Sequence, residues 1–426
     1  MNSIQHRPFG QNYVFVAAGV VFLALLAAAG VRAAPGVLIL PLGNAFGWTR
    51  DSISLAAAVG IFFYGMVGPF AAALMQAIGI RRTLIGALTL MALSIATSAW
   101  MSKPWHLLLS WGVFSGIGSG CVAMVLGATV VNRWFVKHRG LMMGLLTAST
   151  ATGTLAFLPL LASIAQHGGW RPVIWTVSAA CALLIPVAWW LLPERPEDIG
   201  LRPYGASADE VIAEPEKRKL LAIAFGALAR ASKHRTFWFL FATFFICGFT
   251  TNGLIGTHFI ALCGDHGIPE VRAASVMAMM GAFDLIGTTL SGWLTDRYDP
   301  RKLLFVYYAL RGLSLIWLPY SDFSLTSLSL FGMFYGLDWI ATVPPTLRLA
   351  SEAFGDRDAP VVFGWIAAGH QIGAASAALF AGFMRTQGGS YLQPFVIAGV
   401  TGLVAAGIAL TIRRRPHSAM PLAAAG

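Results

Sequence analysis

Long uninterrupted runs of apolar residues, separated by short polar segments, make up most of this chain. Most runs reach the roughly 20 residues that a helix needs to cross a membrane. They are solid and rich in glycine and alanine, whereas strands of a membrane barrel alternate apolar and polar residues over about ten positions. The pattern predicts twelve helical spans, near residues 14–40, 53–77, 83–101, 105–131, 140–165, 172–192, 236–262, 273–294, 303–320, 324–347, 360–384 and 391–412.

The composition narrows the class of protein. Apolar residues make up 57% of the 426 positions and charged residues only 11%, and 46 positions are glycine. A soluble domain carries about 25% charged residues. We therefore expect an all-α integral membrane protein with many passes. The four cysteines show no metal-ligand spacing, so we interpret them as packing residues and expect no metal and no cofactor.

Positive charge is concentrated in alternate loops. With the N-terminus inside, the inner segments hold 22 of the 29 Lys and Arg residues and the outer loops hold five. Cytoplasmic loops carry such an excess, which predicts a bacterial cytoplasmic (inner) membrane with both termini cytoplasmic. Topology and membrane lipid account for the net charge of +11, so we expect no nucleic-acid partner.

The chain repeats its own pattern at an offset of 220 residues, where segments 70–82 and 290–302 each end an apolar run and begin a short basic loop. A long polar segment lies between the two halves. We predict six-helix bundles at residues 1–192 and 236–426, joined by a cytoplasmic linker at 193–235. Residues 220–231 within the linker fit either an amphipathic helix on the membrane surface or a solvated tether.

Four charged residues lie inside the predicted spans: Arg32, Asp284, Arg311 and Asp338. A charge at mid-bilayer costs about 2.5–3.5 kcal/mol. Such residues are therefore expected to face a protein interior or a wet cavity and to pair, and they are the first candidates for function.

The segment GWLTDRYDPRK at 292–302 follows the eighth predicted span. Together with the twelve-helix duplication, it resembles the loop motif of the major facilitator superfamily, and the resemblance covers nearly the whole chain. It implies a transporter rather than an enzyme, with two pseudo-symmetric six-helix bundles. It also implies that the motif residues latch neighbouring helices on the inner face and act as a gate: Asp296, Arg297, Arg301 and Lys302.

The first-half copy of this motif differs from the pattern, because Gln76 stands where the resemblance implies an acid and Ala77 where it implies an Arg. Gly79, Arg81 and Arg82 remain as gating-loop candidates. For the two arginines, the excess of positive charge on the inner side is an equally good explanation.

Two further segments, PLGNAFGWTRDSIS at 41–54 and NRWFVKHRGLMMG at 132–144, are similar to the monocarboxylate and oxalate/formate porter branch of the superfamily. That branch moves small organic anions, commonly with a proton, and often carries an Asp and an Arg one turn apart on the eighth helix. Asp284 fits the acid, but Thr288 stands where the Arg is implied. A cation for the substrate must then come from another helix.

Arg32 is our candidate for that cation, because a guanidinium matches a carboxylate in shape and charge. The superfamily places the first helix along the central cavity, and Pro35 is expected to interrupt this helix near the site. A structural ion pair or a snorkelling side chain is the alternative for Arg32.

Other polar residues within the spans are candidate substrate contacts, each with helix packing as the alternative. Asn252 is the repeat equivalent of Arg32, and Tyr64 is the repeat equivalent of Asp284. His258 and His370 could also relay protons. Gln371 follows His370 in a run of small residues.

Asp284 is our candidate proton carrier, because an apolar site favours the protonated carboxyl group. A permanent ion pair with Arg311 is the alternative. We expect Arg311 to act as a counter-ion, and Asp338 either to pair with Arg311 or to carry a proton itself.

These observations predict a monomeric secondary transporter that imports a small, monocarboxylate-like organic anion with protons, by rocking two bundles around a midplane site. The alternative is a proton-coupled drug or cation exporter of the same fold, in which Asp284 and Asp338 bind the cation. No catalytic motif indicates an enzyme.

Overall fold

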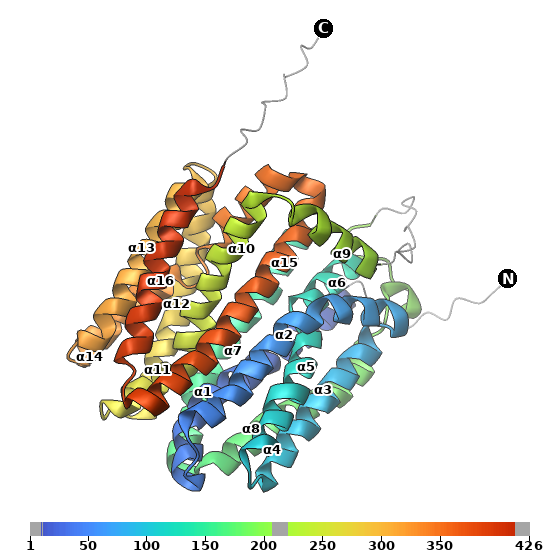
Figure 1. The fold of residues 1–426 in the computed structure, drawn as a ribbon. Helices are drawn as coiled ribbons and strands as arrows, with labels where there is room; N and C mark the ends of the chain where they lie inside the picture. Colours follow the sequence, from blue (N-terminus) through green and yellow to red (C-terminus); the bar gives the residue numbers. More distant parts are fainter. Residues whose placement is uncertain (1–9, 11, 207–219, 414–426) are drawn as a thin grey trace, which may run out of the picture.

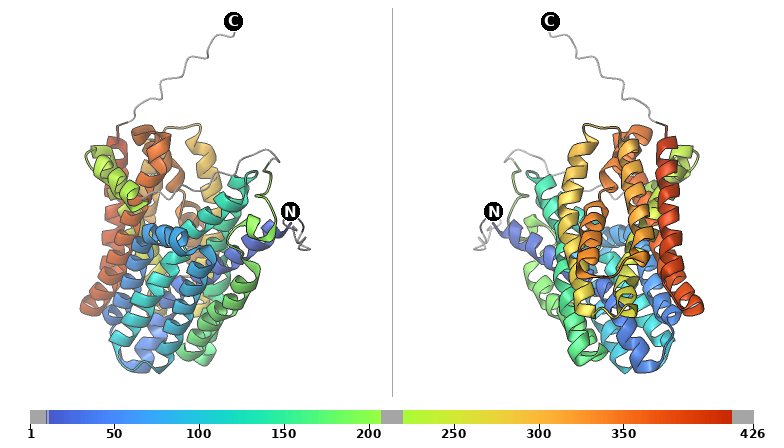
Figure 2. Two further views of the ribbon diagram at one scale, coloured as in Figure 1. Left: turned by 90° about the vertical axis from the view of Figure 1, so that its right-hand side faces the viewer. Right: turned by 90° about the vertical axis from the view of Figure 1, so that its left-hand side faces the viewer.

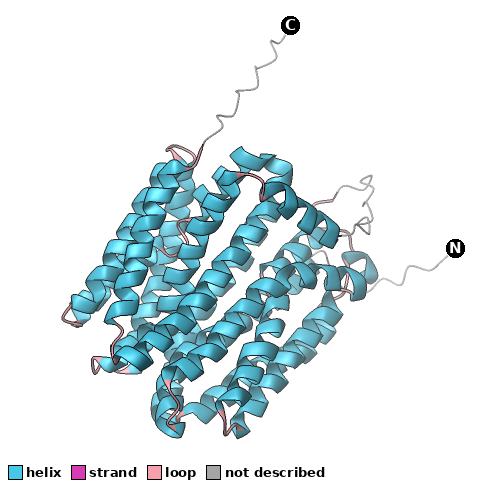
Figure 3. Cartoon of the chain, in the orientation of Figure 1, coloured by secondary structure: helices cyan, strands magenta, loops and turns pink. Residues whose placement is uncertain are grey.

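The computed structural model describes residues 10, 12–206 and 220–413, and helices make up nearly all of this part of the chain (Figures 1 and 3). The first half contains α1 Tyr13–Phe46, α2 Arg50–Ile78, α3 Ile80–Thr97, α4 Pro104–Leu107, η2 Leu108–Phe114, α5 Ser115–Cys121, α6 Met124–Trp134, α7 Arg139–Gly168 and α8 Trp170–Leu191, with short 3-10 turns η1 Ser98–Trp100 and η3 Pro196–Ile199.

The second half begins after the linker. It contains α9 Leu220–Ala231, α10 Arg235–Gly248, η4 Phe249–Ile255, α11 Gly256–Asp265, α12 Glu270–Thr295, α13 Pro300–Trp317, η5 Leu318–Tyr320, α14 Leu325–Asp338, α15 Val343–Gly388 and α16 Leu392–Thr411. The η2 and η4 segments are wider π-helical turns inside longer helical rods. The predicted linker helix has the bounds that the sequence suggested, 220–231.

Ten helical segments in the described part of the chain are long and apolar enough to cross a membrane. The other two predicted spans correspond to α7 and to α14 with the start of α15. Two spans are broken rather than continuous: the fourth between α5 and α6, and the tenth between α14 and α15. The prediction that Pro35 interrupts the first helix is wrong, because α1 runs through Pro35 and Pro41.

The two halves lie side by side as bundles, and Figure 2 shows them from both sides. In the described part of the chain, the halves meet where α2 packs against α15 and α9, α7 against α12, and α1 against α11. We call the face at which α1 begins and α16 ends the terminal face, and the other the opposite face. The bundle boundaries of 1–192, 193–235 and 236–426 stay a prediction, and residues 207–219 of the linker lie outside the described part.

Glycines set the closest approaches between helices. A Cβ atom at Gly287 of α12 would lie 1.8 Å from the carbonyl oxygen of Leu337 on α14, whereas a Cβ at Gly292 would have no atom within 4 Å. Gly287 therefore allows α12 to touch the broken tenth span directly.

We expect Gly287→Ala to lower the free energy of unfolding by about 1–3 kcal/mol, because the methyl group forces the two helices apart. Gly292→Ala on the same helix is the matched control and should not destabilise the protein. The melting temperature of both purified variants in detergent measures this, and equal melting temperatures would rule out the proposed close contact.

Candidate functional site

Arg32 lies on α1 in the lining of a small cavity that the first half forms, except for one lining residue of the second half, Thr257. The water-accessible space of the cavity is about 40 Å³, and its walls come from α1, α2, the η2–α5 rod and α11. The guanidinium carbon of Arg32 lies 4.6 Å from the centre of the Tyr64 ring on α2. Among the described residues, no carboxylate forms an ion pair with Arg32. The structure thus brings Arg32 and Tyr64 together and leaves the positive charge available.

The local sequence explains how this cavity forms. Pro35 lacks the N–H that would bond the carbonyl of Val31, so a backbone acceptor is freed one residue from Arg32. Small residues let neighbouring helices close around the site: a Cβ at Gly36 would lie 2.9 Å from the carbonyl oxygen of Gly256, and Gly116 meets the backbone of α2 in the same way. Three of the lining residues carry hydroxyl groups: Ser115, Ser119 and Thr257.

The two candidate contacts on the seventh span lie near this cavity but not in its lining. The backbone carbonyl of Asn252 accepts a hydrogen bond from Thr257, which does line it. His258 is fully buried, with Nδ1 3.0 Å from the Tyr391 hydroxyl and Nε2 2.7 Å from the Ala378 carbonyl oxygen. His258 therefore ties α11 to the eleventh span and to the start of α16.

His370 and Gln371 lie where α15 packs against other helices. A Cβ at Gly248 would lie 1.8 Å from the carbonyl oxygen of His370, and one at Gly65 would lie 2.3 Å from the Cβ of Gln371. The His370 ring is 5.0 Å from that of Phe244. Both residues thus have close packing contacts, and their contact with a substrate stays a prediction.

The other charged residues within the spans gather at the break between α14 and α15. The Nε atom of Arg311 donates to Oδ2 of Asp338 at 2.6 Å, and both side chains are buried. The same guanidinium donates to the backbone carbonyls of Asp338 and, at 3.3 Å, Trp339. Arg311 is therefore both the counter-ion of Asp338 and the cap of the carbonyl groups that α14 leaves free.

Asp284 contacts the other side of the same break. Its Oδ1 accepts the backbone N–H of Ile340 at 2.9 Å and the hydroxyl of Thr288 at 3.0 Å. Thr288 is the residue that replaces the Arg of the porter branch, and here it serves the carboxylate as a hydrogen-bond donor. Ser291, one turn further on, donates to the carbonyl of Ala341 at 2.5 Å. Of the pairings considered from the sequence, the structure contains Arg311–Asp338 rather than Arg311–Asp284.

The predicted gating residues of the second half lie at the α12–α13 turn. Arg301 pairs with Asp299 at 2.7 Å and donates to the carbonyl of Ile412 at the end of α16. Arg297 lies over Trp293, with 4.1 Å between its guanidinium carbon and the ring centre. The remaining two motif residues, Asp296 and Lys302, have exposed side chains.

In the first half, Glu194 occupies the turn between α2 and α3. Its carboxylate accepts the backbone N–H groups of Ile80 at 2.6 Å and Arg81 at 3.0 Å. Gly79 has a φ of 99°, and a Cβ there would lie 2.3 Å from the Glu194 carboxylate. An acid from the end of α8 thus stabilises the turn whose own motif acid is missing. Arg82 is exposed.

A charged cluster on the opposite face was not anticipated from the sequence. Asp265 at the end of α11 binds Arg50 of α2 at 2.5 Å and Arg385 of α15 at 2.7 Å. Thr386 donates to Asp51 across the same boundary at 3.1 Å. These contacts close the two halves against each other on this face.

Tyr391 connects the cluster to His258. Its hydroxyl lies 3.2 Å from Nη1 of Arg50 and 3.0 Å from Nδ1 of His258. These residues lie so far apart in the chain that no regular spacing predicts their contact. A single sequence also does not show which charged residues of the outer loops pair with one another.

The chain is similar to a protein family, to individual proteins and to solved structures. A family model described as Major Facilitator Superfamily matches residues 20–342. Monocarboxylate transporter 13 of Bos taurus is 26% identical over 390 residues, which cover 91% of this chain and 86% of that protein. The gallate transporter of Pseudomonas putida is 24% identical, over 64% of this chain and 62% of its own.

Two solved structures share the fold. The bacterial homolog of the human lysosomal transporter Spinster, in an inward-facing and unoccupied conformation, aligns with a TM-score of 0.73 at 18% identity, covering 96% of this chain and all of that one. The D-xylose-proton symporter aligns with a TM-score of 0.73 at 15% identity, covering 94% and 98%.

Removing the buried guanidinium of Arg311 should destabilise the folded protein. We expect Arg311→Met to lower the free energy of unfolding by about 3–5 kcal/mol, because it leaves Asp338 as an uncompensated buried charge. Adding Asp338→Leu should restore part of the loss, but not all, because the carbonyls at residues 338 and 339 still lack their donor. Melting temperatures of the single and double variants test this. Complete recovery would contradict the capping role, and no recovery would contradict the ion pair.

Loosening the opposite face should expose residues between the halves. Leu40 of α1 lies against Gly264 of α11. In a Leu40→Cys variant, we expect Asp265→Asn to speed maleimide labelling by about two- to fivefold, because partly exposed ion pairs contribute up to about 1 kcal/mol each. Asp322→Asn, whose contacts stay within the second half, is the control. Equal labelling rates in both variants would show that the cluster does not hold this face closed.

Proposed function

Since the chain belongs to the Major Facilitator Superfamily, we propose that this multi-pass membrane transporter imports a small monocarboxylate-like anion together with a proton. The observation that carries the proposal is the position of Arg32, a guanidinium in the lining of a first-half cavity that Thr257 of the second half also lines, with no carboxylate partner among the described residues. A carboxylate bound there would supply the missing negative charge in bidentate geometry.

The surroundings of Arg32 favour an anion over a cation. The face of the Tyr64 ring compensates a positive charge only in part, at about 0.5–2 kcal/mol. Of the hydroxyl groups in the lining, those of Ser119 and Thr257 donate to backbone carbonyls, and that of Ser115 offers a further donor. Two of the relatives are named as transporters of carboxylates, monocarboxylates in one case and gallate in the other.

The charge count at the tenth span supports proton binding. Two buried carboxylates, Asp284 and Asp338, lie at the break in this span with one guanidinium, Arg311, which pairs with Asp338. A net negative charge buried in a membrane is costly, so one proton on either carboxylate makes the cluster neutral. Oδ1 of Asp338 is buried and has no hydrogen-bond partner among the described residues, so it is the oxygen of this carboxylate that Arg311 does not occupy.

In the proposed cycle, the two bundles at 1–192 and 236–426 rock about the Arg32 cavity, and the linker at 193–235 joins them. The cluster of Arg50, Asp265 and Arg385 closes the opposite face in the state described here. The protein works as a monomer in a bacterial inner membrane, with both termini in the cytoplasm.

A ligand screen tests the substrate class. We expect carboxylates to raise the melting temperature of the purified protein, and to do so more at about pH 5.5 than at about pH 7.5, because binding stabilises the folded state and a proton accompanies the anion. Stabilisation by lipophilic cations alone, stronger at the higher pH, would instead indicate the exporter.

Two variants test the roles of the residues. Arg32→Ala should reduce uptake into proteoliposomes by about tenfold or more, and Arg272→Ala, an exposed arginine on the opposite face, should not. Asp284→Asn should preserve substrate exchange but abolish accumulation driven by a proton gradient. Normal uptake by Arg32→Ala would remove Arg32 from the site, and normal accumulation by Asp284→Asn would remove Asp284 from coupling.

A further inference from the structure

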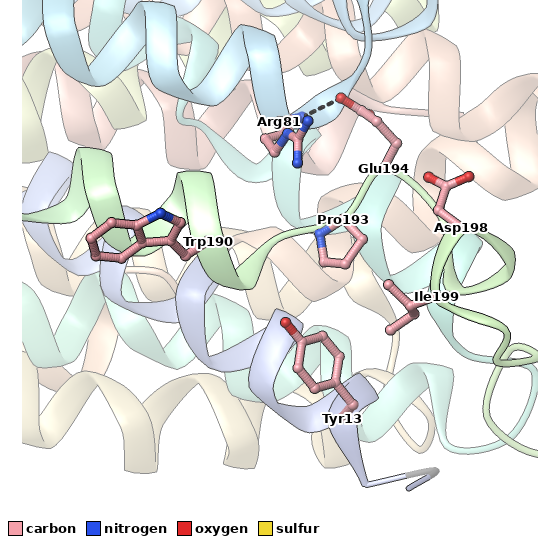
Figure 4. A pocket seen from close by; sticks show the side chains of 7 residues that line it. All are labelled: Tyr13, Arg81, Trp190, Pro193, Glu194, Asp198 and Ile199. Atoms are coloured by element: carbon pink, nitrogen blue, oxygen red, sulfur yellow. Dashed lines mark hydrogen bonds between the residues drawn. The ribbon is translucent and has the colours of Figure 1, made fainter. Parts of the chain in front are cut away.

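The charged groups of the two faces differ in what they join. On the terminal face, Glu194 accepts the backbone N–H of Arg81 at the turn between α2 and α3, and both residues belong to the first half (Figure 4). On the opposite face, Asp265 of α11 binds Arg50 of α2, so this ion pair crosses between the halves. A change of charge beside Arg50 therefore acts directly on the contact between the halves.

A chain of hydrogen bonds leads from Arg50 into the interior of the second half. Nη1 of Arg50 donates to the Tyr391 hydroxyl at 3.2 Å, and this hydroxyl lies 3.0 Å from Nδ1 of His258 on α11. Nε2 of His258 lies 2.7 Å from the carbonyl oxygen of Ala378 on α15. The His258 side chain is fully buried, whereas that of Arg50 is 20% exposed. Only the outer end of the chain therefore meets the solvent in the closed state.

The direction of these hydrogen bonds is fixed at Ala378. A carbonyl oxygen only accepts hydrogen bonds, so Nε2 of His258 carries the hydrogen and Nδ1 of the neutral ring accepts one. The Tyr391 hydroxyl therefore donates to Nδ1, and its oxygen accepts from Arg50. Each hydrogen in the chain has an acceptor as long as His258 is neutral.

A proton on Nδ1 of His258 reverses its contact with Tyr391. Both nitrogens of an imidazolium are donors, so Nδ1 would direct an N–H at an oxygen that already accepts from Arg50. The hydroxyl hydrogen of Tyr391 would then lose its acceptor. A buried hydrogen-bond donor without a partner costs about 1–3 kcal/mol.

The proton would also add a third positive charge around one phenol. The guanidinium carbons of Arg50 and Arg385 lie 5.5 and 5.9 Å from the centre of the Tyr391 ring, and Asp265 already pairs with both guanidiniums. Of the other elements packed against α11, η4 carries no ionisable side chain, α1 carries Arg32 over Tyr64, and α12 carries Glu270 and Arg272 at its start. Arg50 is the cation at Tyr391 that belongs to the first half, so its departure relieves the repulsion by separating the halves.

We propose that His258 is a proton-binding site that controls the opposite face. The neutral imidazole holds Arg50 through Tyr391 and keeps this face closed, whereas protonation releases Arg50 and lets the face open. Histidine suits this task because its imidazole changes charge near neutral pH. The inference rests on the rocking of the halves in the proposed function, and it adds a proton site separate from Asp284 and Asp338.

The sign of the pH dependence follows from linkage. The open arrangement binds the proton at His258 more tightly than the closed one, so the population of open molecules rises as the pH falls. A single proton changes the ratio of open to closed molecules by at most about tenfold per pH unit.

Distances between spin labels on the two halves test the proposal. Full-length protein with Lys103→Cys and Arg272→Cys carries one label on each half at the opposite face, where both positions are exposed. The four native cysteines are buried. Double electron–electron resonance without substrate should show the ratio of the longer to the shorter distance rising about fivefold or more from about pH 7.5 to about pH 5.5.

Two variants should abolish this response to pH, leaving a change of less than about twofold. His258→Gln removes the titrating ring, and Tyr391→Phe keeps the aromatic ring but removes the hydroxyl between His258 and Arg50. His266→Gln, an exposed histidine two turns along the same helix, is the matched control and should respond as the wild type does. Melting temperatures show that each variant is folded before distances are compared.

Several outcomes would overturn the proposal: no pH response in the wild type, a response that persists in His258→Gln or in Tyr391→Phe, or the loss of the response in His266→Gln as well. Because no substrate is present and uptake is not the readout, such a failure leaves the transport proposal standing. Conversely, normal uptake by Arg32→Ala would count against the proposed anion site without changing the result of this experiment.

Discussion

The interior of a membrane offers no water to a charged side chain or to a backbone group that a helix leaves free, and this constraint organises the second half of the chain. The break between α14 and α15 frees carbonyl groups on one side and an N–H group on the other. Arg311 binds the carbonyls and Asp284 binds the N–H of Ile340. The buried charged side chains and the free backbone groups at the helix break would each be costly alone. Each therefore supplies the hydrogen bonds that the other needs. In other transporters, bound cations can meet the carbonyls of an unwound helix; here the guanidinium, tethered by its own helix, does so.

The lack of water inside a membrane also explains why Arg32 is a candidate binding residue. In the second half the guanidinium has a carboxylate and backbone carbonyls around it, whereas the guanidinium of the first half has an aromatic face and a small cavity. The pseudo-symmetric halves thus differ in how their charges within the spans are paired. Arg311 has a carboxylate partner inside the second half, whereas Arg32 has none among the described residues, and in the proposed function a bound anion supplies it. This asymmetry is the physical basis for placing the anion and the proton at separate centres.

Much of the fold was accessible from the sequence, because apolar runs and basic loops follow directly from the thickness and charge of a membrane. The four charged residues within the spans were identified for the same reason. Their partners were not: Pro344 and Pro345 mark the start of α15, but that Arg311 pairs with Asp338, and that Asp284 bonds a backbone group, depends on how α12 and α13 pack against this break. At Pro35 the error is the opposite one, since the sequence predicts a break in α1 and the structure has none. A helix packed against neighbours on several sides tolerates one missing hydrogen bond. Contacts between the halves, such as Arg50 with Asp265, depend on packing across some 215 residues of chain and leave no trace in one sequence.

The ion pairs on the opposite face join two arginines to one aspartate, and a second carboxylate, Asp51, lies at the same boundary bonded to Thr386. A motion that draws α2 away from α11 and α15 would place Arg50 on one wall of the widening mouth and Arg385 on the other. Arg50 would then lose its ion pair with Asp265, and the positive potential around its guanidinium would attract anions in a manner that weakens as salt is added. A residue that holds this face shut would thus, once separated from its partner, become a first point of encounter for an anion.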